Sequence, residues 1–96
     1  MPVAICGFRK NGRELLKRIQ ACGVQVAYII ERNYEALSVL EEDLNIPIVG
    51  FEEDADFYLK AERILLTGDI PDAVVVECMR VAGIDLPLET VDKGEW

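Results

Sequence analysis

Residues 3–16 read Val3-Ala4-Ile5-Cys6-Gly7-Phe8-Arg9-Lys10-Asn11-Gly12-Arg13-Glu14-Leu15-Leu16. The apolar run Val3–Cys6 is predicted to form the first strand, Gly7 follows it, and a second glycine stands at position 12. A continuous apolar run is typical of a central parallel strand that is buried on both faces. Apolar residues at helical spacing begin at Leu15. The stretch therefore predicts a strand, a tight turn, and a helix that begins near Gly12 with Asn11 as its N-cap.

Apolar strands and amphipathic helices alternate along the rest of the chain. Further strands are predicted at 24–30, 47–49, 63–67 and 84–91, and helices at 12–22, 34–44, 51–61 and 70–82. Pro47 places the third strand at a sheet edge, in either direction, and Asp69 is expected to cap the last helix. This order predicts one Rossmann-like domain over residues 1–96, a doubly wound three-layer α/β sandwich. Its mostly parallel sheet has about five strands in the order 3-2-1-4-5.

Composition and charge exclude several classes of function. The formal net charge is −8, which repels phosphate backbones, so we expect no nucleic-acid partner. We find neither an apolar run long enough for a bilayer nor a signal peptide, and we expect a cytoplasmic protein without a membrane partner. The chain has no histidine, which excludes Ser-His-Asp and Cys-His catalysis and removes the commonest zinc ligand.

Cysteines and carboxylates give no metal-binding pattern. Cys6, Cys22 and Cys78 lack CxxC spacing and lie in apolar contexts, so we expect buried free thiols. The cluster Glu52-Glu53-Asp54-Asp56 lacks the glycine and the terminal glutamate of an EF-hand loop. We predict that it is a solvated face and that the chain has no metal site.

A ligand of a doubly wound sheet binds at the carboxyl ends of the strands, where the strand order reverses. Here that point lies between the first and fourth strands, and Glu31 follows the second strand. Helix N-termini follow both loops, and their N–H groups can hold an anion. Asp69 is the best candidate for a catalytic carboxylate, although a helix cap is the simpler interpretation, and we assign no catalytic residue. The predicted ligand-binding residues are Gly7, Phe8, Arg9, Lys10, Asn11, Gly12, Glu31, Thr67, Gly68 and Asp69.

The turn departs from the dinucleotide fingerprint G-x-G-x-x-G at Arg9, which stands where the second glycine lets backbone approach a pyrophosphate. Two alternatives stay open: the Arg9 guanidinium contacts a phosphate or carboxylate itself, or the site has degenerated to a plain turn. The basic residues around the turn likewise either attract a small anion or form a solvated helix face. P-loop spacing is present, but Arg13-Glu14 replaces the required Lys-Ser/Thr, which excludes that motif.

Three segments together resemble small Rossmann-like domains of bacterial sugar metabolism: 3–31, Ile46-Pro47-Ile48-Val49-Gly50, and 63–83. They are similar to the N-terminal nucleotide-sugar-binding domain of bacterial sugar acetyltransferases. They also resemble the cofactor-like domain of polysaccharide-biosynthesis epimerases and dehydratases. The resemblance implies NAD(P) or a nucleotide-sugar over the turn from Gly7 to Gly12, with Glu31 near the ribose.

The sequence leaves two functional hypotheses. The first is a non-catalytic nucleotide-type binding module, accessory to sugar or polysaccharide metabolism, because we expect one domain over residues 1–96 without the catalytic second domain of those enzymes. It would act as a homo-oligomer or with another polypeptide. The second is a structural or oligomerisation domain with a degenerate cofactor site, favoured by the 51% hydrophobic content. A free-standing oxidoreductase is disfavoured, since no histidine is present to shuttle protons.

Overall fold

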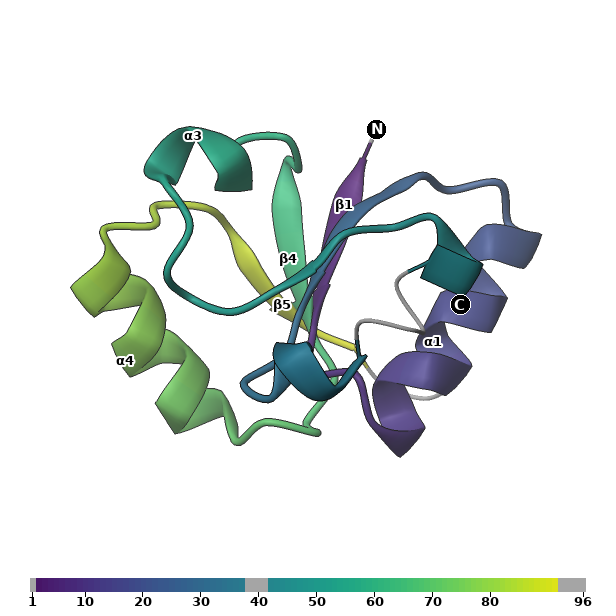
Figure 1. Ribbon diagram of the computed structural model, residues 1–96, viewed down its shortest axis with the longest axis horizontal. Helices are drawn as coiled ribbons and strands as arrows, with labels where there is room; N and C mark the ends of the chain where they lie inside the picture. The colour runs from purple at the N-terminus through teal and green to yellow at the C-terminus, as the bar shows by residue number, and fades with distance from the viewer. Residues whose placement is uncertain (1, 38–41, 92–96) are drawn as a thin grey trace.

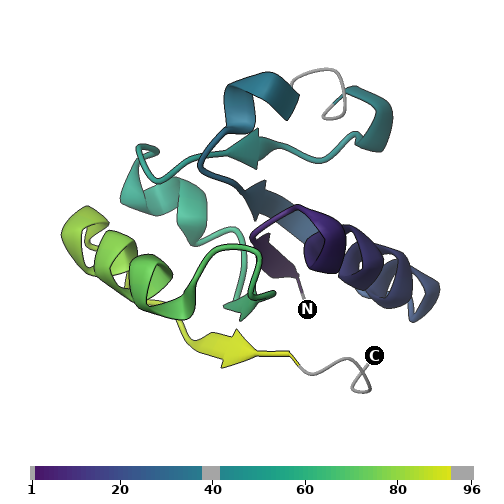
Figure 2. The same cartoon turned by 90° about the horizontal axis from the view of Figure 1, so that it is seen from below.

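The computed structural model describes residues 2–37 and 42–91. The strands are β1 (Val3–Cys6), β2 (Val26–Ile30), β3 (Ile48–Val49), β4 (Arg63–Leu66) and β5 (Leu88–Thr90). They form one sheet in the order β3-β2-β1-β4-β5, and all four pairings are parallel. The predicted Rossmann-like α/β fold and strand order are therefore confirmed, and the short third strand runs parallel at one edge. Figure 2 shows β5 at the other edge.

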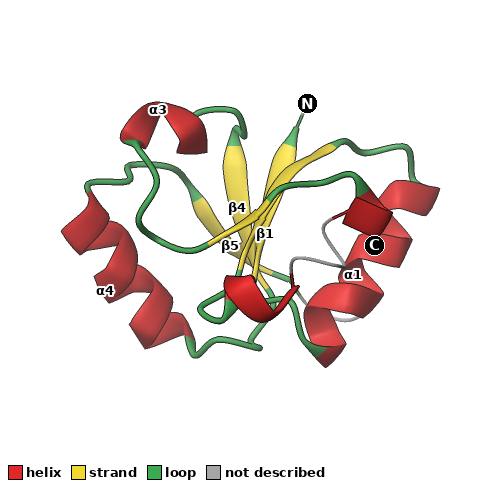
Figure 3. Ribbon diagram, viewed as in Figure 1, coloured by secondary structure: helices red, strands yellow, loops and turns green. Residues whose placement is uncertain are grey.

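Helices cover both faces of the sheet (Figures 1 and 3). Helical elements include α1 (Lys10–Ala21), the 3₁₀ helix η1 (Tyr34–Leu37), α3 (Ala55–Tyr58) and α4 (Asp72–Ala82). Residues 42–44 are also helical. Alternate residues of a strand point to opposite faces. Ile5 therefore packs in the cluster that holds Leu16 and Ile19 of α1, whereas Ala4 packs in the cluster that holds Val75 of α4. Because all four strand pairings are parallel, the carboxyl ends of the strands lie at one end of the molecule.

Two predicted helices differ from the observed ones. The helix expected over 51–61 is reduced to α3, because the Tyr58 hydroxyl holds the preceding loop: it donates to the Gly50 carbonyl at 2.8 Å and accepts from the Glu53 N–H at 3.2 Å. The helix expected over 34–44 begins as a 3₁₀ turn, and its predicted core residue Leu40 lies outside the described residues. The acidic cluster over 52–56 is exposed, as expected.

The expected burial of the cysteines is wrong at one position. Cys6 is buried and Cys78 is half-buried, but Cys22 is exposed. α1 ends at Ala21, and the chain then turns at Gly23 with a φ of 75°, which leaves Cys22 as the C-cap on the solvent side. Within the part of the chain that the structure describes, no helix is long and apolar enough to span a bilayer.

Candidate functional site

Close approach of backbone explains both glycines of the turn after β1. Gly7 has a φ of 97°, and a Cβ there would lie 2.5 Å from the Thr67 hydroxyl oxygen. A Cβ on Gly12 would overlap the Gly7 carbonyl oxygen, because the first turn of α1 packs directly on the turn. Left-handed backbone and close approach are the two conditions that favour glycine. The chain's own packing is therefore sufficient to require both glycines.

The N-terminus of α1 is occupied by a carboxylate of the same chain. Asp69 accepts hydrogen bonds from the backbone N–H groups of Arg9 at 2.8 Å, Asn11 at 3.2 Å and Gly12 at 2.7 Å. The first N–H groups of a helix have no partner within the helix, and the helix dipole favours a negative charge there. Asp69 thus stabilises the start of α1 in the way that a bound anion would.

Two predicted capping roles are wrong. Asp69 does not cap the last helix, because the N-cap of α4 is Pro71, which has no side-chain capping bond. The loop turns at Gly68, which has a φ of 84°, and the Asp69 side chain bonds to the start of α1 instead. Asn11 is not the N-cap of α1, since that helix begins at Lys10, two residues before the predicted start, and its N-cap is Arg9. The Asn11 amide instead donates to the Thr67 carbonyl at 3.2 Å.

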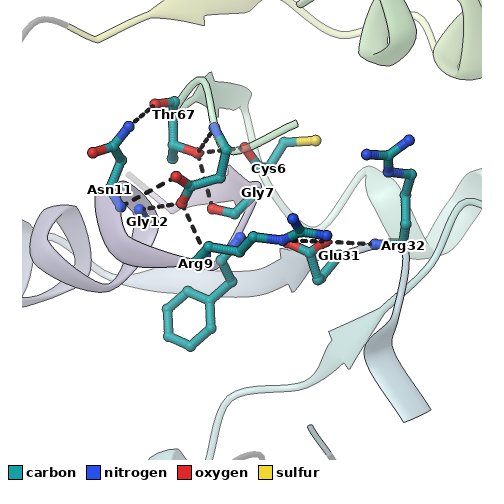
Figure 4. A network of polar contacts seen from close by, with 10 residues as sticks. Cys6, Gly7, Arg9, Asn11, Gly12, Glu31, Arg32 and Thr67 are labelled. Carbon is teal, nitrogen blue, oxygen red and sulfur yellow. Dashed lines mark hydrogen bonds and ion pairs between the residues drawn. The ribbon is translucent and has the colours of Figure 1, made fainter. Parts of the chain in front are cut away.

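Thr67 joins the β1 turn to the loop after β4 (Figure 4). Its hydroxyl lies 3.1 Å from the Cys6 carbonyl oxygen and 3.0 Å from that of Gly7, and it donates to this pair. The same hydroxyl oxygen accepts the Asp69 N–H at 3.2 Å. The structure therefore brings together the two loops that the strand order predicts to meet, and it holds them with hydrogen bonds.

Glu31 lies at the end of β2 and is only 2% exposed. One carboxylate oxygen accepts the Phe8 N–H at 2.7 Å, and the other accepts the Arg32 N–H at 3.1 Å. The Arg9 side chain extends toward it, with Nε 3.9 Å from a carboxylate oxygen (Figure 4). Since a buried carboxylate needs hydrogen bonds and a compensating charge, Arg9 and the Phe8 N–H together keep Glu31 in place.

A groove of about 520 Å³ opens beside this network. Its size lies within the usual range for small-molecule sites, about 300–1,000 Å³. The guanidinium carbon of Arg13 lies 5.6 Å from the centre of the Phe8 ring. Over residues 2–37 and 42–91, neither Lys10 nor Arg13 forms an ion pair. The groove is lined by Phe8, Arg9, Lys10, Arg13, Glu31, Asn33 and Leu37.

Cys6 lies next to the turn but is a poor nucleophile. Burial raises the pKa of its thiol to about 12, and the nearby Glu31 carboxylate acts in the same direction. A thiol attacks as its thiolate, so Cys6 stays protonated and unreactive at neutral pH. Cys6 therefore supplies no nucleophile to the groove.

The predicted site residues separate into two groups. One group lines the groove and consists of Phe8, Arg9, Lys10 and Glu31. The other group forms the packed network beneath the turn and consists of Gly7, Asn11, Gly12, Thr67 and Asp69. The left-handed backbone of Gly68 sets the direction of the loop after β4. Sequence reasoning missed Asn33 and Leu37 as lining residues, and it counted Arg13 only among the basic residues around the turn and not among the ligand-binding residues. Arg13 lies one helical turn after Arg9, a spacing that places the two side chains on neighbouring parts of the helix surface.

Comparison with known proteins finds no matching family model, no similar curated protein and no similar solved structure. The resemblance to sugar acetyltransferases and to epimerases or dehydratases therefore stays a prediction. What the structure establishes is a small Rossmann-like α/β domain with a basic groove at the carboxyl ends of β1 and β2.

Proposed function

We propose that this chain is a non-catalytic module that binds a small anionic ligand of the nucleotide type in the groove beside α1. The observation that carries the proposal is the grouping of Arg9, Lys10 and Arg13 around one groove of a chain whose net charge is −8. A concave site with convergent polar groups is the usual form of a small-molecule site. Bringing several positive side chains close together costs electrostatic free energy unless an anion compensates their charge.

The position of the groove supports the same conclusion. The groove opens beside the carboxyl ends of β1 and β2, at the end of the sheet where doubly wound folds bind their ligands. It lies one strand away from the predicted switch point between β1 and β4, where Thr67 and Asp69 of the chain itself bond to the β1 turn. Glu31 lines the groove although it is largely buried, and the carboxylate lone pairs that the Phe8 and Arg32 N–H groups leave unused can accept hydrogen bonds from sugar hydroxyl groups. A role beside enzymes of sugar or polysaccharide metabolism, with NAD(P) or a nucleotide-sugar as ligand, follows from the sequence resemblance alone.

A ligand screen tests this proposal. Thermal unfolding is followed with AMP, UMP, NAD(H), NADP(H), UDP-sugars and CoA at millimolar concentration, because a ligand of the folded state raises the Tm. We expect at least one of them to raise the Tm, and we expect Lys10→Gln and Arg13→Gln to reduce the shift. Lys17→Gln is the matched control, since Lys17 is exposed on the same helix and does not line the groove. No shift with any ligand would reject the proposal.

A structural or oligomerisation domain is the second candidate. It is favoured by two exposed apolar side chains on α4, Val76 at 52% and Val81 at 73% exposure. Size-exclusion chromatography with light scattering tests it: a dimer that dissociates in a Val76→Ser, Val81→Ser variant would support this candidate. A strict monomer at high concentration would argue against it.

A further inference from the structure

We infer that the groove selects a ligand with one terminal phosphate, a nucleoside or sugar phosphomonoester, over a dinucleotide with a bridging pyrophosphate. The inference rests on the proposed binding function and names the class of anion. It follows from which hydrogen-bond donors around the turn are already used and which remain.

Four backbone donors of the turn are already used by two carboxylates. The N–H groups of Arg9, Asn11 and Gly12 donate to Asp69, and that of Phe8 donates to Glu31. A dinucleotide in its usual position places its pyrophosphate against these N–H groups. Here it would have to displace Asp69 and lie beside two negative charges, which repel it strongly where water is partly excluded.

Side-chain donors remain available at the groove. Arg9, Lys10 and Arg13 are exposed and line it, and among the described residues only Arg9 of these three is engaged with a carboxylate, at 3.9 Å. A phosphomonoester carries a charge of about −1.5 to −2 at neutral pH and three strongly accepting oxygens. Each phosphate of a bridging pyrophosphate carries a single charge and has fewer free oxygens. Three converging cations therefore favour the terminal phosphate.

The other end of the ligand meets a polar and partly apolar wall. Glu31 can accept a hydroxyl, and Asn33 offers both a donor and an acceptor, while Leu37 provides apolar contact. Nucleoside monophosphates and sugar monophosphates share the phosphate and the hydroxyl groups that these side chains recognise. The base distinguishes the two sources, so the experiment includes both.

Isothermal titration calorimetry on the full chain compares AMP, UMP, glucose 1-phosphate and inorganic phosphate with NAD and ADP-ribose. We expect AMP, UMP or glucose 1-phosphate to bind at least about tenfold more tightly than either pyrophosphate compound, and more tightly than inorganic phosphate. Lys10→Gln and Arg13→Gln should each weaken the monoester about three- to tenfold. Lys17→Gln should leave it unchanged.

The outcomes separate the inference from the proposed function. If NAD or ADP-ribose binds as tightly as the best monoester, the inference fails and the binding function stands. If a monoester binds but the groove variants bind it as well as the Lys17→Gln control, the site lies elsewhere and the inference fails. If no compound binds at millimolar concentration, the proposed function fails and the inference fails with it.

Discussion

The carboxylate of Asp69 lies 2.7 Å from the backbone nitrogen of Gly12, although the two residues are 57 positions apart in the chain. This contact ties the loop after β4 to the first turn of α1. It also places a negative charge where a helix N-terminus attracts anions. The turn that resembles a cofactor fingerprint is therefore held together by a carboxylate of the same chain.

Replacing Asp69 should destabilise the fold. Asp69→Ala removes a charged acceptor from three backbone donors, and we expect the free energy of unfolding to fall by about 2 kcal/mol. Urea denaturation followed by circular dichroism measures the change. Asp85→Asn, at an exposed position, is the control and should change stability by less than about 0.5 kcal/mol. A similarly small effect for Asp69→Ala would contradict the capping role.

Gly12→Ala should lower stability even without any ligand. The added Cβ would overlap the Gly7 carbonyl oxygen, and backbone must shift to make room, at a cost of about 1–3 kcal/mol or more. Gly23→Ala is the comparison, because no atom lies within 4 Å of its added Cβ and only its φ of 75° opposes the change. We expect a smaller cost there, about 1 kcal/mol. Equal costs in urea denaturation would contradict the steric account of Gly12.

Stability should fall as the pH rises above 9. Burial raises the pKa of Cys6 from its ordinary 9.0 to about 12, so the unfolded chain loses this proton first. The folded pKa is raised, so the stabilisation is complete below pH 9 and is lost progressively between pH 9 and pH 12. Burial also raises the pKa values of Tyr28 and Tyr58, which adds to the loss.

Urea denaturation at several pH values measures this slope. Cys6→Ala should flatten the decline above pH 9, because it removes one of the groups that ionise only on unfolding. Cys22→Ala is the control and should leave the slope unchanged, since Cys22 is exposed. A free energy of unfolding that stays constant from pH 8 to pH 11 would contradict the burial of these groups.

Thiol labelling should distinguish the three cysteines. Single-cysteine variants are treated with an excess of a thiol reagent at neutral pH, and the rate of modification is followed. We expect Cys22 to react fastest, Cys78 more slowly, and Cys6 only as fast as the protein unfolds. Rapid modification of Cys6 in the native protein would show that the end of β1 is open.

The first four strands and the strand order could be predicted because these strands are short, mostly apolar runs between turn residues, and such runs are local signals. β5 has a single apolar residue, Leu88, and is shorter than the predicted 84–91. Val3–Cys6 matches the predicted first strand residue for residue. The partner of Asp69 could not be predicted, because an aspartate two residues before Pro71 is equally suited to capping the next helix. The left-handed backbone at Gly68 decides between the two. The shortness of α3 has a similar cause, since it depends on hydrogen bonds of Tyr58 to residues outside the helix.

In the candidate site, too, the positions of residues could be predicted from the sequence but their hydrogen-bond partners could not. The meeting of the two loops follows from the strand order, and Glu31 could be placed because it directly follows β2. Its partners could not be predicted, since an acidic residue there can accept either ribose hydroxyls or, as observed, the Phe8 N–H. The spacing of Gly7 and Gly12 is compatible with a bound cofactor, yet the close packing of Gly12 on the Gly7 carbonyl is sufficient to explain why residue 12 is glycine.

The most direct test of a phosphate-binding groove beside α1 is a titration of ¹⁵N-labelled protein with AMP, followed by amide chemical shifts. We expect shifts confined to residues 8–13 and 31–37, with saturation at a single affinity, and their loss in a Lys10→Gln, Arg13→Gln double variant. Shifts centred on α4, or no shifts at millimolar AMP, UMP and glucose 1-phosphate, would contradict the account.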